Sequence, residues 1–447
     1  MDDAKPKQRA SAAVPSSRLS RMASLTDLAG RVAGNLVADG SRHWIKGQRP
    51  AMSELLLSAK NLEQVAAKLA RMRGAAMKLG QLISMDSGAL LPPELANVLS
   101  RLRDDAVIMP AAQLVDVLEH NWGSNWDQTL AQFSFDPIAA ASIGQVHKGR
   151  THEGRELAIK IQYPGVRRSI DSDIDNVVSL LRLSGLLPRE LEIDSLVEEA
   201  KHQLYLETDY LHEQQQLQEY SQALQSFRHA GALLIPGVDK ALTTEQILCM
   251  DFVEGVSLIQ AAEQKRALRN EIPALLLELF FCELFQLHRV QTDPNPANYQ
   301  YNLTSDQLVL LDFGAVRQFS SDFVRQYHRA ICAATDRDTA TLAEALETLG
   351  FFSQRHDAAN RQVVLDIFVE ATEPLRTPGE YDFGRSDLAQ RIHQRGMAIS
   401  STPEAWHTPP ADVLFLHRKM GGLFMLAAQL GACVDVHAIF SRYRELL

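Results

Sequence analysis

The chain has few cysteines, and their spacing suits neither a metal site nor a disulfide framework. Four cysteines are scattered over 447 residues without a Cys-x-x-Cys or a paired Cys/His arrangement: Cys249, Cys282, Cys332 and Cys433. Such usage is typical of a reducing compartment. We therefore expect neither a structural zinc ion nor a disulfide scaffold.

Long hydrophobic runs are missing as well. No stretch reaches the roughly 18 uninterrupted apolar residues of a membrane helix. The best candidate, Ile272 to Leu287, is interrupted by Glu278 and Glu283 and predicts a buried helix. The first residues are acidic and polar, which fits neither the apolar core of a secretory signal nor an acid-poor mitochondrial presequence. We expect a soluble or peripheral protein.

Basic residues are also fewer than acidic residues. The formal net charge is −10, which argues against a dedicated nucleic-acid binder. Residues 1–50 depart from this balance, with nine Lys and Arg against four Asp. This basic segment is expected to be disordered or loosely amphipathic. It could contact an anionic membrane surface or remain a solvated tail.

The hydrophobic pattern predicts an α+β protein with a small mixed lobe and a larger helical lobe. Apolar residues recur at helical spacing in 53–107 and in most of the chain beyond Ser257, and a long helical stretch is expected from Ile193 to about Gln225. Short strands are expected at 133–146, 157–162, 232–236 and 246–253, together forming a small sheet, and a hairpin at 299–303 and 308–311. The predicted divisions are 1–50, 51–115, 116–256 and 257–447.

Three separated elements follow the order that phosphoryl transfer on a kinase fold requires. A strand ends in Lys160, which suits the neutralisation of α- and β-phosphates. Asp293 and Asn298 stand five positions apart, and a hydrophobic strand leads into Asp312-Phe313-Gly314. An Asn carbonyl and an Asp carboxylate can together hold Mg²⁺ against phosphates, while a separate carboxylate orients or deprotonates the nucleophile. Each element alone is weak, but their order predicts a Mg²⁺-nucleotide site.

Longer motifs around these residues carry a family resemblance. The chain contains Lys78-Leu79-Gly80-Gln81, an alanine-rich segment from Ala139 to His147, Glu207-Thr208-Asp209, and Gln291-Thr292-Asp293-Pro294-Asn295-Pro296-Ala297-Asn298. With these motifs the chain resembles the UbiB/ADCK family of atypical kinases over roughly residues 50–320. The resemblance implies a two-lobed kinase-like fold with an N-terminal helical extension that carries the Lys-x-Gly-Gln motif. Val14-Pro15-Ser16-Ser17-Arg18 is similar to the branch that serves ubiquinone biosynthesis.

The resemblance also implies roles for particular residues. The alanine-rich loop is expected to replace a glycine-rich phosphate loop, and Cβ atoms make such a loop stiffer. Met250 and Phe252 fit the linker whose backbone contacts adenine. Lys78 and Gln81 are expected in the active site, where they would exclude a bulky protein substrate. The expected nucleotide-binding loop residues are Ala139, Ala140, Ala141, Ser142, Ile143, Gly144, Gln145 and Val146.

The ion-pair partner of Lys160 has two candidates. Glu207 and Glu213 point about 120° apart on helical geometry, so one unbent helix cannot present both to the same lysine. The resemblance assigns the pairing to Glu213. It places Glu207 and Asp209 near the Lys-x-Gly-Gln element or the metal.

The sequence leaves three functions open. The first is a Mg²⁺–ATP or Mg²⁺–ADP binding ATPase that supports ubiquinone biosynthesis, acting on prenylated lipid intermediates or on the enzymes that modify them. The second is a phosphotransferase with Asp293 as base and a protein or small molecule as acceptor. The third is a lipid-binding scaffold switched by nucleotide. The expected location is cytoplasmic and peripheral to a membrane, in preference to the mitochondrial matrix.

Overall fold

A computed structural model describes residues 69, 72–87, 108–183, 193–352, 358–400 and 410–446. The described chain divides into two compact units. Residues up to 83, from 108 to 214 and from 237 to 252 form the first, and the other described residues form the second. The basic segment 1–50 and much of the helical region expected at 53–107 lie outside the described residues. The divisions at 51, 116 and 257 stay predictions.

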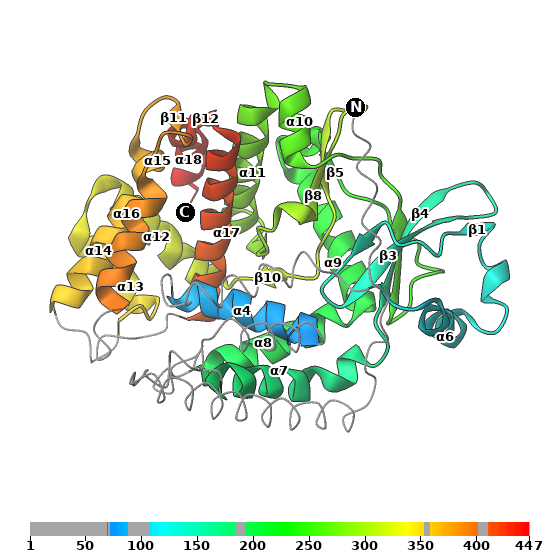
Figure 1. Cartoon of the computed structure of the whole chain (residues 1–447). Helices are drawn as coiled ribbons and strands as arrows, with labels where there is room; N and C mark the ends of the chain where they lie inside the picture. Colours follow the sequence, from blue (N-terminus) through cyan, green and yellow to red (C-terminus); the bar gives the residue numbers. More distant parts are fainter. Residues whose placement is uncertain are drawn as a thin grey trace, which may run out of the picture. The chain divides into compact units, whose positions relative to one another are not determined.

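The first unit is built on an antiparallel sheet in the order β1-β3-β4-β6, with β2 also pairing with β3. Figure 1 labels β1, β3 and β4 of this sheet. The longest pair is β3 with β4, in which Val146 lies opposite Lys160. The strands are β1 (Gln132–Phe133), β2 (Ala139–Ala140), β3 (Gly144–Arg150), β4 (Glu156–Gln162) and β6 (Ile247–Asp251). They confirm the strands expected at 157–162 and 246–253.

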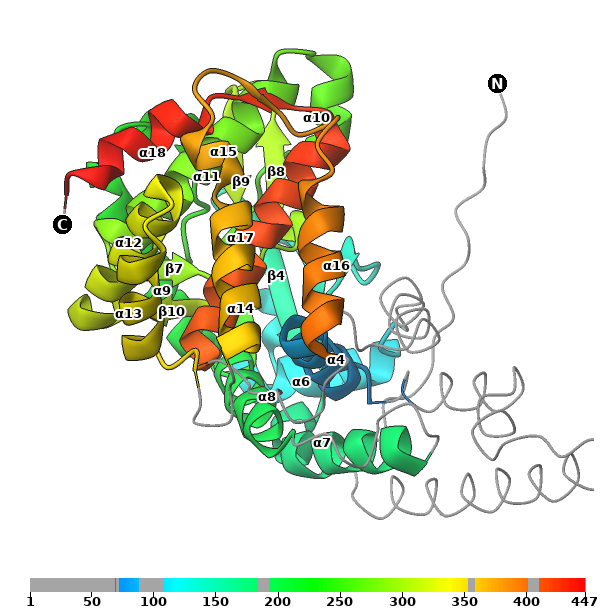
Figure 2. The same ribbon diagram turned by 90° about the vertical axis from the view of Figure 1, so that its left-hand side faces the viewer.

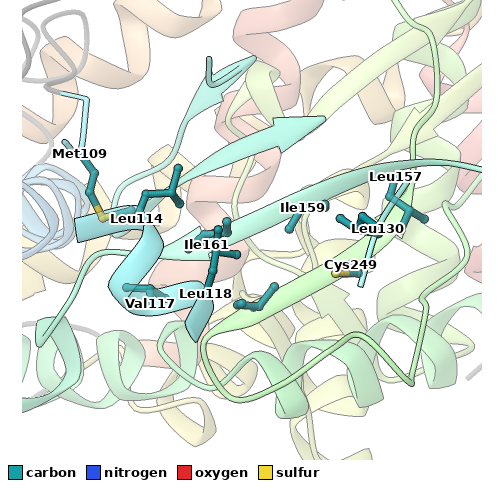
Figure 3. Packing of buried hydrophobic residues seen from close by; sticks show 10 residues of the cluster. Met109, Leu114, Val117, Leu118, Leu130, Leu157, Ile159, Ile161 and Cys249 are labelled. Carbon is teal, nitrogen blue, oxygen red and sulfur yellow. The ribbon is translucent and has the colours of Figure 1, made fainter. Parts of the chain in front are cut away.

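The core of this unit lies between the sheet and one amphipathic helix. Leu114, Val117 and Leu118 of α6 (Ala111–Trp122) pack against Leu157, Ile159 and Ile161 of β4, as Figure 3 shows. The alternate residues of β4, including Lys160, are less buried than these three, because successive side chains of a strand point to opposite faces. The apolar face therefore fixes the strand, and the strand holds Lys160 away from the core.

The helical stretch predicted from Ile193 is interrupted once. The structure has α8 (Asp194–Glu207) and α9 (Tyr210–Ala223) in its place. The Thr208 hydroxyl donates to the carbonyl of Tyr205, and the Asp209 carboxylate accepts from the amide of His212 at 3.0 Å. Such local side-chain bonds compete with the helix and cap a new one. The helical stretch expected from Ile193 to about Gln225 is therefore present as two helices.

Among the described residues, the first unit contains two further helices. They are α4 (Arg73–Ser87), whose residues to 83 belong to this unit, and α7 (Val166–Leu183). Leu79 and Leu82 of α4 are buried, so the helix predicted around the Lys-x-Gly-Gln motif is present. The side chain of Gln81 lies outside what the structure describes.

The second unit is mainly helical. Helices α11 and α17 pack side by side (Figure 1), and α14 and α16 do the same (Figure 2). The helix expected at 272–287 is present as α11, with Glu278 and Glu283 buried. The helices are α10 (Leu258–Gln264), α11 (Leu268–Phe285), α12 (Ser321–Asp336), α13 (Thr339–Thr348), α14 (Ala358–Ala371), α15 (Glu373–Arg376), α16 (Leu388–Ser400), α17 (Ala411–Leu430) and α18 (Val436–Arg444).

Three small sheets complete the second unit. Strands β8 (Tyr299–Asn302) and β9 (Gln307–Leu310) form the predicted hairpin, and β5 (Leu233–Leu234) pairs in parallel with β9. The sequence had assigned β5 to the sheet of β6, and that assignment was wrong, because two apolar residues do not specify which strand edge they join. The other pairs are β7 (Arg289–Gln291) with β10 (Val316–Gln318) and β11 (Tyr381–Asp382) with β12 (Cys433–Val434). None of the described helices is long and apolar enough to cross a membrane.

Candidate functional site

Lys160 forms a partly buried ion pair in the first unit. Its ammonium donates to the two carboxylate oxygens of Glu213 at 2.9 and 3.0 Å. The side chains are 13% and 2% exposed, and the ammonium lies 5.1 Å from the ring centre of Tyr210. Because α9 begins after the break at Thr208, it presents Glu213 to β4 independently of Glu207. Of the two candidate partners, Glu213 therefore pairs with Lys160 and Glu207 does not.

The alanine-rich segment is a tight hairpin beside this lysine. Ala139 pairs with Val146, and Val146 pairs in turn with Lys160, so the three residues are lateral neighbours. The amide of Ala141 donates to the carbonyl of Gly144 at 2.8 Å and closes the turn. A Cβ on Gly144 would lie 2.3 Å from the carbonyl oxygen of Ile161, so this position requires glycine.

Not every residue of the predicted loop is equally accessible to a ligand. Ala139 is exposed, and Ala140, Ala141 and Ser142 are half-buried, whereas Ile143, Gly144 and Gln145 are buried. The Gln145 side chain accepts from the amide of Met109 and is bonded to the His147 ring. It is therefore part of the core of the unit.

Lys78 lies in α4 and reaches the same part of the first unit. Its ammonium donates to Glu207 at 2.5 Å, with Lys78 7% and Glu207 21% exposed. The other Glu207 oxygen accepts a long hydrogen bond of 3.5 Å from the Ser142 hydroxyl in the alanine-rich turn. Gly74 packs on this turn, since a Cβ there would lie 3.0 Å from Ile143. Helix α4 with the Lys-x-Gly-Gln motif, Glu207 of the Glu-x-Asp motif and the alanine-rich turn are thus in contact.

The residues expected to bind adenine lie in and directly after strand β6. Met250 is buried within β6, which pairs with β4 on one side and forms a bridge to Val238 on the other. The amide of Phe252 donates to the carbonyl of Glu156 at 2.9 Å, and Lys148 lies 4.0 Å from the centre of the Phe252 ring. The adenine contact stays a prediction. At Phe252 it would need the carbonyl, because the amide is occupied.

In the second unit, the predicted catalytic and metal-binding residues are organised around one short turn. Pro296–Asn298 forms a 3₁₀ turn capped by the Asn295 side chain, and Asn298 donates to Asp293 at 3.0 Å. The amide of Leu311, next to Asp312, donates to the carbonyl of Asn298 at 3.0 Å. Asp312 itself accepts from the amide of Gly314 at 2.9 Å.

This donor set fits Mg²⁺. Asp312 and Asn298 offer hard oxygen ligands. The hydrogen bond from the Leu311 amide to the Asn298 carbonyl holds their two segments side by side. Among the described residues, no group of three His, Cys, Asp or Glu side chains could hold a metal by itself. Mg²⁺ commonly takes one or two protein oxygens and fills its remaining positions with phosphate oxygens and water.

Sequence reasoning missed the contribution of α17. Arg418 donates to one oxygen of the Asp293 carboxylate at 2.5 Å, and Asn298 donates to the other oxygen. One turn further on, Gly422 packs against Pro294, where a Cβ would lie 2.4 Å from the proline Cβ. The sequence signal was the pair Gly421-Gly422 inside an apolar helix, since glycine in a helix often marks close packing.

A buried polar cluster flanks the segment from Asp293 to Asn298, which is called the catalytic turn below. Lys419 donates to the Tyr299 hydroxyl at 2.5 Å and to the Gln291 side chain at 3.0 Å. Burial lowers the pKa of Lys419 and raises that of Tyr299. Burial also raises the pKa of Glu283 to about 8, although the nearby Lys419 charge and the Gln291 amide act in the opposite direction.

Comparisons with known proteins identify the family of the chain. The family model of the ABC1 atypical kinase-like domain matches residues 101–346. The mitochondrial atypical kinase COQ8 of Saccharomyces cerevisiae is 35% identical over 432 residues, covering 96% of this chain and 85% of the yeast protein. The mitochondrial atypical kinase COQ8B of Rattus norvegicus is 35% identical over 433 residues, covering 96% and 80%.

A solved structure is similar as well. The erythromycin complex of Rv3197 from Mycobacterium tuberculosis superimposes with a TM-score of 0.58 at 25% identity, covering 87% of this chain and 96% of that one. Together with the family model and the COQ8 relatives, this match supports the atypical kinase-like fold predicted from the sequence. The chain belongs to the family of ABC1 (UbiB/ADCK) atypical kinase-like proteins.

Proposed function

We propose that this protein binds and turns over Mg²⁺–ATP as an atypical kinase or ATPase in support of ubiquinone biosynthesis. The observation that carries the nucleotide chemistry is the Lys160–Glu213 ion pair on a strand bordered by the alanine-rich hairpin. A strand lysine held by a glutamate is the phosphate-binding arrangement of protein kinases. The role in ubiquinone biosynthesis rests on the similarity to the COQ8 proteins.

Each unit supplies its own part of the proposed chemistry. In the first unit, Lys160 neutralises nucleotide phosphates and the alanine-rich turn approaches them through its backbone. In the second, Asp312 and Asn298 bind Mg²⁺, and Asp293 orients the nucleophile. The bound metal neutralises charge that develops on the phosphate oxygens. Glu207, Asp209, Lys78 and Gln81 act around the alanine-rich turn, with the Glu-x-Asp carboxylates as further candidates for metal binding.

Asp293 is proposed to orient water or a small acceptor in preference to a protein hydroxyl. Its carboxylate accepts from Arg418 and from Asn298. A carboxylate held by two donors in this way can still accept a hydrogen bond from the nucleophile, because each of its oxygens has two lone pairs. By the family resemblance, Lys78 is proposed to exclude a bulky protein substrate. We therefore place slow ATP hydrolysis first and phosphotransfer to a small molecule or protein second.

Prenylated lipids of the quinone pathway, or the enzymes that modify them, are the proposed partners. We propose peripheral contact with an anionic membrane, through the basic segment 1–50. Location in the cytoplasm of a bacterium remains our proposal, while the COQ8 relatives named above are mitochondrial.

The test follows the γ-phosphate of labelled ATP. Purified protein is incubated with Mg²⁺ and anionic liposomes, with and without a quinone-precursor mimic. Label released as inorganic phosphate, and released faster with lipid, supports the ATPase. Label transferred to a lipid-phase molecule or a protein supports the phosphotransferase. Tight nucleotide binding without turnover under all conditions would instead support a switched scaffold.

A further inference from the structure

One buried lysine contacts both ends of the catalytic turn of the second unit. Lys419 is 2% exposed and donates to two side chains that flank the turn. Gln291 lies two residues before Asp293, and Tyr299 immediately follows Asn298. The residues between these anchors include the proposed nucleophile-orienting carboxylate and one proposed metal ligand.

Burial of this ammonium is costly, which argues against simple packing. A lysine ammonium taken out of water destabilises the fold unless its donors are satisfied, and apolar residues of similar volume often replace buried charges without loss. The ammonium also lies 5.3 Å from the centre of the Tyr299 ring. The two hydrogen bonds of Lys419 link the side chains of Gln291 and Tyr299, and so restrain the distance between these two positions of the chain.

Thr292 and Asp293 of this segment have further contacts. The hydroxyl and the amide of Thr292 both donate to the carbonyl of Ala315, beyond the Asp312-Phe313-Gly314 segment. Arg418, adjacent to Lys419 in α17, donates to Asp293. Lys419 reaches both the beginning and the end of the turn, where the Tyr299 hydroxyl also donates a long hydrogen bond of 3.4 Å to the Gln291 side chain.

We propose that Lys419 is a positioning residue that sets the separation of Asp293 and Asn298, and thereby the Mg²⁺ affinity of the site. It acts through Gln291 and Tyr299 and does not itself touch metal or nucleotide. This inference rests on the proposed Mg²⁺–ATP turnover and deepens it. A metal ligand displaced by a fraction of an ångström binds Mg²⁺ less well, because this ion demands near-ideal octahedral geometry.

The experiment measures ATP turnover as a function of Mg²⁺ concentration for the full chain and for Lys419→Met. We expect the half-saturating Mg²⁺ concentration to rise at least tenfold and kcat to fall roughly a hundredfold, since a misplacement of about 1 Å costs that much. Binding of Mg²⁺-free ADP should remain within about twofold of wild type. Lys265→Met is the matched control, because Lys265 is an exposed lysine of the same unit paired with Asp306 in the β8–β9 turn. It should leave both parameters unchanged.

Tyr299→Phe keeps the ring and removes only the hydroxyl, so it serves where Lys419→Met fails to fold. It should shift the Mg²⁺ dependence in the same direction by a smaller factor. A fall in kcat or in melting temperature with an unchanged Mg²⁺ dependence in either variant would reduce Lys419 to a structural role and overturn the proposal. Absence of Mg²⁺-dependent turnover in the wild type would instead remove the proposed function, and this inference with it.

Discussion

Substitution of Gly422 by alanine tests how tightly α17 holds the catalytic turn. The added Cβ would lie 2.4 Å from Cβ and 2.6 Å from Cγ of Pro294. Carbon atoms in good contact are about 3.5–4.0 Å apart, so helix and turn must separate by about 1 Å. Overpacking of this kind costs roughly 1–3 kcal/mol of stability. Displacement of the neighbouring Asp293 by the same amount should lower kcat by roughly a hundredfold, equivalent to about 2.7 kcal/mol.

The adjacent glycine supplies the control. A Cβ on Gly421 would meet nothing within 4 Å, yet this residue belongs to the same helix. Gly421→Ala should therefore keep full turnover and gain up to about 1 kcal/mol, because alanine favours the helix over glycine. Urea denaturation gives the stability of each variant, and a coupled ATPase assay gives kcat.

The comparison between the two variants is decisive. Equal turnover in Gly422→Ala and Gly421→Ala would refute the claim that α17 positions the catalytic turn. Lower turnover in both would point to a general sensitivity of the helix and would refute the specific contact with Pro294.

Three further substitutions test other parts of the account. Glu213→Gln removes the charge that holds Lys160 and should lower ATP turnover at least tenfold, about 1.4 kcal/mol, with a cooperative unfolding transition retained in circular dichroism. Ala141→Gly loosens the alanine-rich turn and should change the dissociation constants of ATP and ADP measured by calorimetry; unchanged constants would count against a phosphate-binding role for the turn. Glu283 has a folded-state pKa of about 8, above its ordinary value of 4.5, so it keeps a proton on folding that the unfolded chain releases. Its contribution to stability is therefore present below pH 4.5 and is lost as the pH rises towards 8, by up to about 1.4 kcal/mol per unit. Glu283→Gln should gain stability relative to wild type over this range in urea titrations, and a pH-independent difference would contradict the assignment.

Much of the fold could be predicted from local pattern. The alternation around Lys160 specified β4, and the apolar run with Glu278 and Glu283 indicated a buried helix, because both signals depend on residues close in sequence. The pairing of β5 with β9 could not be predicted, since two residues carry no register information. The break before α9 depends on side-chain bonds of Thr208 and Asp209 that compete with the helix.

The candidate site was predicted unevenly for a similar reason. Motifs identified Asp293, Asn298 and Asp312 because each belongs to a short, ordered pattern. Arg418 and Lys419 belong to no such pattern: they follow Asp293 by more than 120 positions in sequence and meet its turn only through the packing of α17. A basic pair on a helix usually indicates a solvated face, so only the structure identifies these two as partners of the turn.

The central claim is that Mg²⁺ bound through Asp312 holds the nucleotide. Its most direct test is calorimetric titration of Mg²⁺–ATP into the wild type and into Asp312→Asn, each repeated without Mg²⁺. The account predicts saturable, Mg²⁺-dependent binding by the wild type and none by the variant. Equal Mg²⁺-dependent affinity in both proteins would contradict it.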